Sequence, residues 1–167
     1  MWNKVAEYLK DYPERLAVAK ILIKNGLTVR NGRIYCDEIV ISTLGVSRAA
    51  GVDRRTVTQT IKMIRGDPEL NAIFKNIRPA GASLREIARY LNLGVVEITP
   101  VDARMPGILA RSASLIAEQN ISIRQAIVDD PELTPEPRLT LIAERKIPGE
   151  LIPQLLKTNG VSRVSVY

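Results

Sequence analysis

Residues 101–123 read VDARMPGILARSASLIAEQNISI, and this segment decides the fold of the second half of the chain. An alternating run over residues 95–101 leads into it, which predicts a strand followed by a tight turn. Met105, Pro106 and Gly107 then open an apolar helix, with the proline at its first position. The first amides of a helix have no acceptor within the helix, and glycine lets a ligand approach the backbone closely. The turn therefore predicts a site for a small anion, such as the carboxylate of an amino acid.

The pattern continues from this segment as a complete small domain. The predicted elements are a strand at 94–101, a helix at 106–118, strands at 121–128 and 138–144, a helix at about 149–158 and a strand at 161–166. Right-handed crossovers place both helices on one face of a four-stranded antiparallel sheet, which is the ferredoxin-like βαββαβ arrangement. Pro153 interrupts the apolar pattern of the second helix, so that helix either starts late or bends there. The loop 129–137, with four acids and three prolines, suits an exposed hairpin connection better than a metal site.

The first half of the chain is predicted to be mostly helical. Its expected helices run from about Met1 to Leu9, from Pro13 to about Asn25, over 42–50, over 54–65, after an Asp67 cap with Pro68 in the first turn, and over 83–91 from a capping box of Ser83 and Glu86. Residues 27–41 look extended, and Asn31 with Gly32 predicts a two-residue hairpin turn. The composition changes to strand-like alternation after residue 92. We therefore expect an α+β chain of two domains, residues 1–92 and 93–167.

Two of these helices form a helix-turn-helix pattern. Gly51 lies at the turn, and Val57, Ile61 and Ile64 recur at the spacing of a buried helix face. Burial of that face turns outward a set of groups that reach bases and phosphates, because arginine pairs with guanine and glutamine with adenine. The expected DNA contacts are Arg54, Arg55, Thr58 and Gln59 on the second helix, with Lys62, Arg48 and Thr56 placed to contact phosphate. The alternative is that these groups form the solvated face of an ordinary three-helix packing.

The net charge of +6 is carried by the first half of the chain. Residues 1–92 hold 16 Lys and Arg against 9 Asp and Glu, and residues 93–167 hold 8 against 9. The two parts therefore carry +7 and −1, which favours a polyanion as the partner of the first part alone.

Histidine is absent and Cys36 is the single cysteine. This excludes intrachain disulfides, zinc sites built from nitrogen and sulfur ligands, and histidine-based catalytic dyads and triads. Cys36 is expected to be a small, half-buried hydrophobic residue without a role. Since the sequence also has no phosphate-binding Gly-Lys loop, we expect no metal, no cofactor and no enzymatic activity. No apolar run is long enough to cross a bilayer and the first residues are not a secretory signal, so we expect a cytoplasmic protein with no membrane partner.

Two short motifs stand at the ends of the first helix of the second half. They are Pro106, Gly107, Ile108, Leu109 and Ala110, then Ile116, Ala117, Glu118, Gln119, Asn120, Ile121, Ser122 and Ile123. A Pro-Gly-aliphatic-Leu opening and an Asn-aliphatic-x-Ile entry to the second strand resemble those of an ACT domain, and the match extends from Gly94 to Tyr167. In ACT domains the effector, usually an amino acid, lies between two paired modules. The resemblance implies ligand contacts at Met105, Pro106, Gly107, Ile108 and Asn120.

A wider resemblance covers the whole chain. Its motifs are Ile34-Tyr35-Cys36, Gly51-Val52-Asp53-Arg54-Arg55 and Ser122-Ile123-Arg124-Gln125-Ala126. They are similar to those of an archaeal type of amino-acid-metabolism regulator that joins an N-terminal helix-turn-helix to a C-terminal ACT domain. One position departs from the family pattern, because Arg104 stands where many ACT domains have an acidic or amide residue. Arg104 would neutralise a second carboxylate or a phosphate on the ligand.

These features predict a regulator of transcription that senses a small molecule. It is expected to form a homodimer or higher homo-oligomer through its ACT modules, to bind double-stranded DNA, and to change operator affinity when an amino acid or acidic metabolite binds. The alternative function is a regulatory subunit that controls a metabolic enzyme and uses the basic half as a protein-docking surface. A ferredoxin-like fold whose loop binds nothing is the remaining alternative for the second half.

Overall fold

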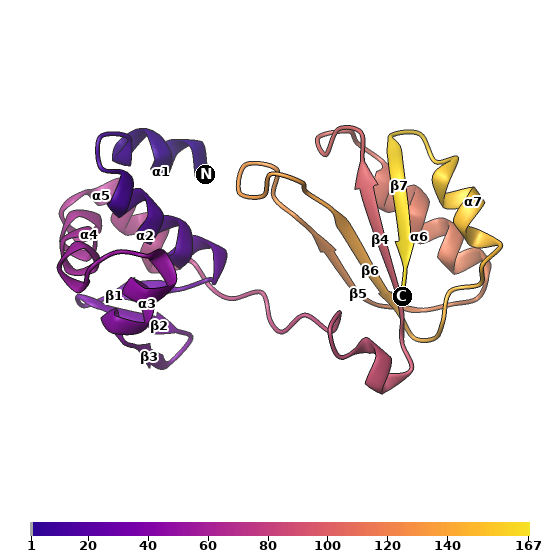
Figure 1. Ribbon diagram of the computed structural model, residues 1–167, viewed down its shortest axis with the longest axis horizontal. Coiled ribbons are helices and arrows are strands. Elements are labelled where there is room, and N and C mark those ends of the chain that lie inside the picture. The colour runs from indigo at the N-terminus through magenta and orange to yellow at the C-terminus, as the bar shows by residue number, and fades with distance from the viewer. Residues whose placement is uncertain (1) are drawn as a thin grey trace. The chain divides into compact units, whose positions relative to one another are not determined.

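The chain folds into two compact units, one ending at Gly81 and the other running from Ala82 to Tyr167. The computed structural model describes residues 2–167, and Met1, the expected start of the first helix, lies outside the described residues. Both units combine helices with an antiparallel sheet, so the predicted α+β class is confirmed (Figure 1). Within residues 2–167, no helix has the length and apolar character needed to span a membrane.

The N-terminal unit contains five helices and a small sheet within the described residues. Its elements are α1 (Trp2–Leu9), α2 (Pro13–Lys24), β1 (Thr28–Arg30), β2 (Arg33–Cys36), β3 (Ile39–Ile41), α3 (Thr43–Ala50), α4 (Arg54–Gly66) and α5 (Pro68–Asn76). Helices α2, α3 and α4 pack against one another, and α5 packs against α4 and β1. This is a helix-turn-helix unit with a three-stranded sheet inserted before its helix pair.

The helix pair α3–α4 is held at both ends by local caps. The Ser42 side chain accepts a hydrogen bond from the Gly45 amide at 3.0 Å, and Asp53 accepts one from the Thr56 amide at 2.6 Å. Between the helices, Gly51 has φ +68°, a left-handed conformation that favours glycine. Val46 of α3 and Val57 of α4 are buried beside this turn. The predicted helix-turn-helix is therefore confirmed.

The predicted hairpin is also confirmed, with one addition. Arg30 and Arg33 are cross-strand partners, so Asn31 and Gly32 form the two-residue turn, with φ of +50° and +77°. A second turn at Asp37 divides the remaining extended stretch into β2 and β3, and the three strands pair in chain order. Asp67 caps α5 as predicted, since its side chain accepts hydrogen bonds from the amides of residues 69 and 70.

The C-terminal unit has the ferredoxin-like arrangement that the sequence predicts. Its elements are η1 (Ala88–Leu91), β4 (Gly94–Pro100), α6 (Ile108–Glu118), β5 (Ile123–Val128), β6 (Leu139–Ala143), α7 (Leu151–Leu156) and β7 (Val161–Val166). The strands pair antiparallel in the order β5-β6-β4-β7, and α6 and α7 lie on one face of the sheet (Figure 1). The core between helices and sheet includes Val96, Ile98, Ile116, Leu141 and Leu155.

The prediction of a helix over residues 83–91 is wrong, because only a single 3-10 turn, η1, forms there. The Ser83 hydroxyl accepts a hydrogen bond from the Arg85 amide, and not from the Glu86 amide as the predicted capping box requires. The side chain of Gln125 on β5 bonds the Leu84 amide at 2.9 Å and the Ala82 carbonyl at 2.9 Å, so these backbone groups are paired with the sheet instead of with a helix.

Residues 82–92 belong to the C-terminal unit, so the boundary between the units follows Gly81 and does not lie near residue 92 as predicted. Leu84, Ala88 and Leu93 pack against Val95 and Ile142 on the face of the sheet opposite the helices. This packing joins residues 82–93 to the C-terminal unit. We name residues 82–93 the strap.

The first residue of helix α7 decides between the two alternatives for Pro153. The helix begins at Leu151, so the proline stands in its first turn, where backbone amides have no intrahelical acceptor. Of the two alternatives, a late start and a bend, the structure shows the late start.

Candidate functional site

Helix α4 presents a cationic face to solvent. Val57, Ile61 and Ile64 are buried on its inner side, as predicted. Arg54, Arg55, Thr58 and Lys62 are exposed, and Arg48 is exposed on α3. The Thr58 hydroxyl donates to the Arg54 carbonyl at 3.0 Å, so it is tied to its own helix.

Two of the expected DNA contacts are turned inward instead. Thr56 is buried, and its hydroxyl donates to a carboxylate oxygen of Glu14 at 3.1 Å. Gln59 is half-buried, and its side-chain oxygen accepts a hydrogen bond from Arg15 of α2 at 3.1 Å. These contacts join α4 to α2 and keep the side chains of Thr56 and Gln59 away from the exposed face of α4.

The start of α4 carries a carboxylate cap. The hydrogen bond that the Thr56 amide donates to Asp53 lowers the pKa of the Asp53 carboxyl below its usual 3.8. The cap therefore stays ionised at neutral pH, where a negative group is favourable at a helix N-terminus. The cap holds the first turn of α4, which carries Arg54 and Arg55.

In the C-terminal unit, the loop between β4 and α6 departs from the prediction at one residue. Gly107 has φ +91° and is the N-cap, so α6 begins at Ile108 and Pro106 precedes the helix rather than opening it. A residue with positive φ lies outside helical geometry, which is why the helix starts after Gly107. No side chain caps the first amides of α6. An added Cβ at Gly107 would come within 3.1 Å of the Arg111 guanidinium.

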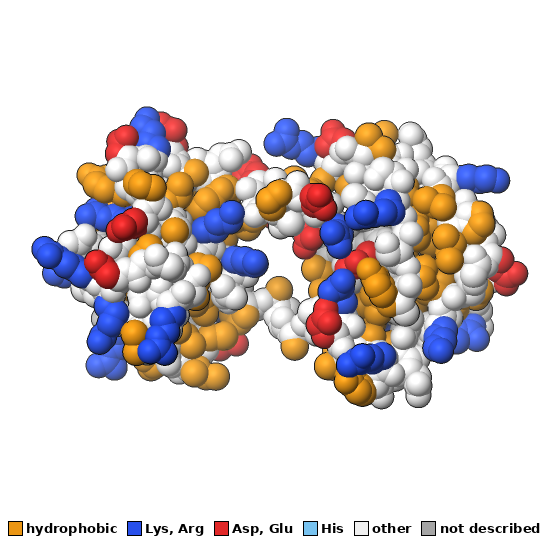
Figure 2. All heavy atoms as spheres, in the orientation of Figure 1, with side chains coloured by type: hydrophobic (Ala, Val, Ile, Leu, Met, Phe, Trp, Pro, Cys, Tyr) orange, Lys and Arg blue, Asp and Glu red, His pale blue; other side chains and the backbone are white. Residues whose placement is uncertain are grey.

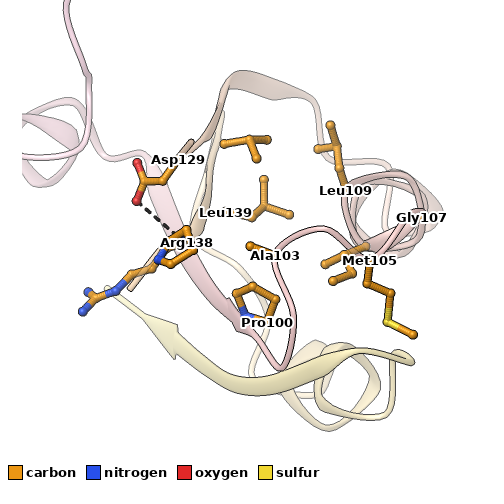
Figure 3. Close-up of a pocket in the computed structure, with 11 residues that line it drawn as sticks. Pro100, Ala103, Met105, Gly107, Leu109, Asp129, Arg138 and Leu139 are labelled. Carbon is orange, nitrogen blue, oxygen red and sulfur yellow. Dashed lines mark hydrogen bonds between the residues drawn. The ribbon is translucent and has the colours of Figure 1, made fainter. Parts of the chain in front are cut away.

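A cavity of about 200 Å³ opens beside this loop (Figure 3). Its lining is mainly apolar and comprises Pro100, Ala103, Met105, Gly107, Ile108, Leu109, Val128, Asp129, Pro137, Arg138 and Leu139. One carboxylate oxygen of Asp129 accepts a hydrogen bond from the Arg138 amide at 3.1 Å, and Figure 3 shows this carboxylate on the side away from the apolar walls. Figure 3 shows the Arg138 guanidinium directed away from the cavity.

The structure brings together only some of the expected ligand contacts. Met105, Gly107 and Ile108 line the cavity. Arg104 lines a neighbouring hollow, and the exposed Pro106 is not among the residues that line either of them. Asn120 follows the far end of α6, whose eleven residues span about 16 Å. Its carbonyl accepts from Arg145 at 3.1 Å, and its φ of +53° ends the helix.

The remaining lining residues were missed by the sequence analysis. Val128 and Asp129 come from the end of β5, and Arg138 and Leu139 from the start of β6. They meet the β4–α6 loop because β6 pairs with both β4 and β5. Only the predicted strand order could have pointed to them, since no local motif marks these positions.

On the opposite face of the sheet, a buried carboxylate joins the strap to the strands. Glu97 is 5% exposed and contacts Arg85 at 2.5 Å and Arg138 at 3.4 Å. It also accepts a hydrogen bond from the Tyr167 hydroxyl at 3.2 Å. The hydrogen bond to Glu97 raises the pKa of Arg85 above its usual value.

No protein-family model matches the chain, and no curated protein matches its sequence. Solved structures that align with it include the transcriptional regulator NMB0573 of Neisseria meningitidis in complex with L-Met, at 13% identity and a TM-score of 0.30, covering 92% of this chain and 86% of that one. The leucine response regulatory protein LrpA of Mycobacterium tuberculosis aligns at 13% identity and a TM-score of 0.28, covering 92% and 89%. AsnC of E. coli aligns at 11% identity and a TM-score of 0.23, covering 92% and 87%. At these TM-scores the alignments carry no argument about this chain.

Proposed function

We propose that this protein is a DNA-binding regulator of transcription that responds to a small molecule bound in its C-terminal unit. The observation that carries the proposal is the exposed cationic face of α4 in a helix-turn-helix. Arg54 and Arg55 stand in the first turn of that helix, the part of a recognition helix that contacts base edges. Lys62 extends the same face, and Arg48 adds a cation on α3.

The cavity beside Gly107 supports an amino acid as the effector. The uncapped amides at the start of α6 suit its carboxylate. The walls formed by Leu109 and Leu139 suit an apolar side chain. Arg104 lines a different hollow and Figure 3 shows the Arg138 guanidinium directed away from the cavity, so neither arginine is placed to pair with an extra negative charge on the ligand. The preferred effector is therefore an apolar amino acid or a related small metabolite.

The rim of this cavity supports a paired module. Leu109 and Val128 line the cavity, yet they remain 42% and 58% exposed. A second copy packed against this rim would cover both side chains and close the site. A homodimer also matches the two-fold symmetry of palindromic operators, with one α4 entering each half-site. In such a dimer the effector acts by favouring one arrangement of the two subunits.

Titration of the full-length chain with duplex DNA tests the proposal. We expect affinity to fall steeply with salt, and Arg55→Ala to weaken binding by about 1–3 kcal/mol at a preferred sequence. The matched control is Arg124→Ala, which removes an arginine that is also exposed but belongs to the C-terminal unit, and which should leave the affinity unchanged. Affinity that stays immeasurable at low salt would exclude DNA binding and favour a regulatory subunit that docks on a protein.

A further inference from the structure

Three arginines lie near the turn at Asn31 and Gly32, but the Arg30 guanidinium is directed to the other turn of the sheet, at Asp37 and Glu38. Arg30 and Arg33 flank the turn as cross-strand partners. Arg65, in the last turn of α4, lies against the same turn, since a Cβ added to Gly32 would be 3.1 Å from its Nη1 atom.

Only one of the three arginines has an acidic partner. The Arg30 guanidinium contacts Glu38 at 3.3 Å, donates to the Asp37 carbonyl at 2.6 Å, and stacks on the Tyr35 ring. Arg33 and Arg65 are exposed, and within residues 2–167 neither makes an ion pair or hydrogen bond through its side chain. Arg33 follows Gly32 directly and Arg65 lies against Gly32, so two unpaired cations belong to this turn.

Arg65 also belongs to the exposed face of α4. Arg55, Thr58, Lys62 and Arg65 are all exposed and recur at intervals of three, four and three residues, which places them in one row along the helix. Figure 2 shows lysine and arginine side chains at the left and lower left of this unit, around α3, α4 and the three-stranded sheet.

The distance from Arg55 to Arg65 along α4 can be compared with the width of the major groove of DNA. At 1.5 Å per residue, Arg65 lies about 15 Å beyond Arg55 along the helix axis. The major groove of B-DNA is about 12 Å wide. If the axis of α4 crosses the groove while its first turn reaches the base edges, its last turn and the Asn31–Gly32 turn lie at the sugar-phosphate backbone.

We propose that Arg33 and Arg65, presented by the Asn31–Gly32 turn and the end of α4, bind the phosphate backbone beside the groove that α4 enters. This inference rests on the proposed DNA binding and adds a contact made by a different element. Phosphate contacts are independent of base sequence and fix the register of a protein on the duplex. The three-stranded sheet thereby acquires a role in positioning the recognition helix.

The test measures binding of the full-length chain to a mixed-sequence duplex of about 30 base pairs over a series of KCl concentrations. Arg33→Ala and Arg65→Ala should each reduce the slope of log affinity against log salt by about 0.9. That slope corresponds to an affinity about eightfold weaker at 0.1 M salt for each variant. Arg33→Lys and Arg65→Lys should keep the wild-type slope, because the counterion effect depends on charge.

The matched control is again Arg124→Ala, which should retain the wild-type slope. If the wild-type chain binds the duplex and Arg55→Ala weakens binding, but Arg33→Ala and Arg65→Ala behave like the control, the phosphate contact is wrong and the proposed function stands. If the wild-type chain fails to bind at about 20 mM KCl, both proposals are wrong. An equal loss of affinity for poly-L-glutamate would assign the turn to an acidic protein partner and overturn the phosphate contact.

Discussion

Gly107 is the residue on which the geometry of the proposed effector site depends. Its φ of +91° is a conformation that residues with a Cβ rarely adopt, and it sets where α6 begins. The Arg111 guanidinium covers the position that a Cβ would occupy. A side chain at this position would therefore both strain the loop and displace Arg111 at the entrance to the first amides of α6.

A thermal-shift experiment with Gly107→Val follows from this geometry. L-leucine, L-methionine and L-glutamate are suitable probes, with an apolar amino acid expected to raise the wild-type Tm. A ligand at a hundredfold excess over its Kd contributes about 2.7 kcal/mol of stability, so the shift is measurable. In Gly107→Val the same ligand should produce no shift, because the added side chain obstructs the backbone.

The matched control for this experiment is Gly149→Val. Gly149 lies in the same unit, is exposed, and has no atom within 4 Å of the position of an added Cβ. Its ligand-induced shift should equal that of the wild type. Equal shifts in Gly107→Val and wild type would remove the effector from this loop.

The site residues show what a local motif reveals and what it leaves out. The importance of Gly107 could be predicted because its backbone conformation and its neighbours belong to one short segment. Asp129 and Leu139 could not be assigned to the site, because their proximity to Gly107 arises from the pairing of β6 with two other strands. Thr56 was misplaced for a related reason, since its partner Glu14 belongs to another helix.

At the scale of elements, an ion pair between Arg85 and Glu97 joins the strap to strand β4 of the C-terminal unit. Arg85 bonds Glu97, which is only 5% exposed in the central strand β4. Removal of one partner from a buried ion pair leaves an incompletely compensated charge. Arg138 and Tyr167 still contact Glu97, which limits the cost.

We therefore expect Arg85→Met to lower the free energy of unfolding by about 2 kcal/mol. Urea denaturation followed by circular dichroism measures this change. Arg89→Met is the matched control, because Arg89 lies on the same strap and, among the residues that the structure describes, its side chain bonds only the neighbouring Tyr90. The control should change stability by less than about 0.5 kcal/mol. Equal effects of the two substitutions would show that Glu97 does not hold the strap.

The elements also show where sequence patterns are sufficient. The helix pair around Gly51 and the hairpin around Asn31 were predictable, because caps and turn residues within each segment agree with the final structure. The strap was mispredicted as a helix because Ser83 and Glu86 form a valid capping box by themselves. The competing hydrogen bonds come from Gln125, which is 41 and 43 residues away from its two partners, and they outweigh that local preference.

At the scale of the whole molecule, the proposed function requires coupling between the two units. Residues 1–81 carry a net charge of +6 and residues 82–167 a net charge of 0, which agrees with a proposed DNA contact in the first unit and a proposed effector contact in the second. An effector changes DNA affinity only through its different affinity for two arrangements of the protein. This coupling is typically about 1–3 kcal/mol, equivalent to a change of about 5- to 150-fold in affinity.

Linkage requires that this coupling be reciprocal, which gives the last prediction. An amino acid that raises the Tm should change the Kd for a preferred duplex by some factor, and saturating duplex should change the Kd for that amino acid by the same factor. Fluorescence anisotropy measures the first constant and isothermal titration calorimetry the second. Gly107→Val should bind the duplex with wild-type affinity and lose the response to the amino acid. If the amino acid binds the wild-type chain but both constants are unaffected by the other ligand, the cavity does not regulate DNA binding.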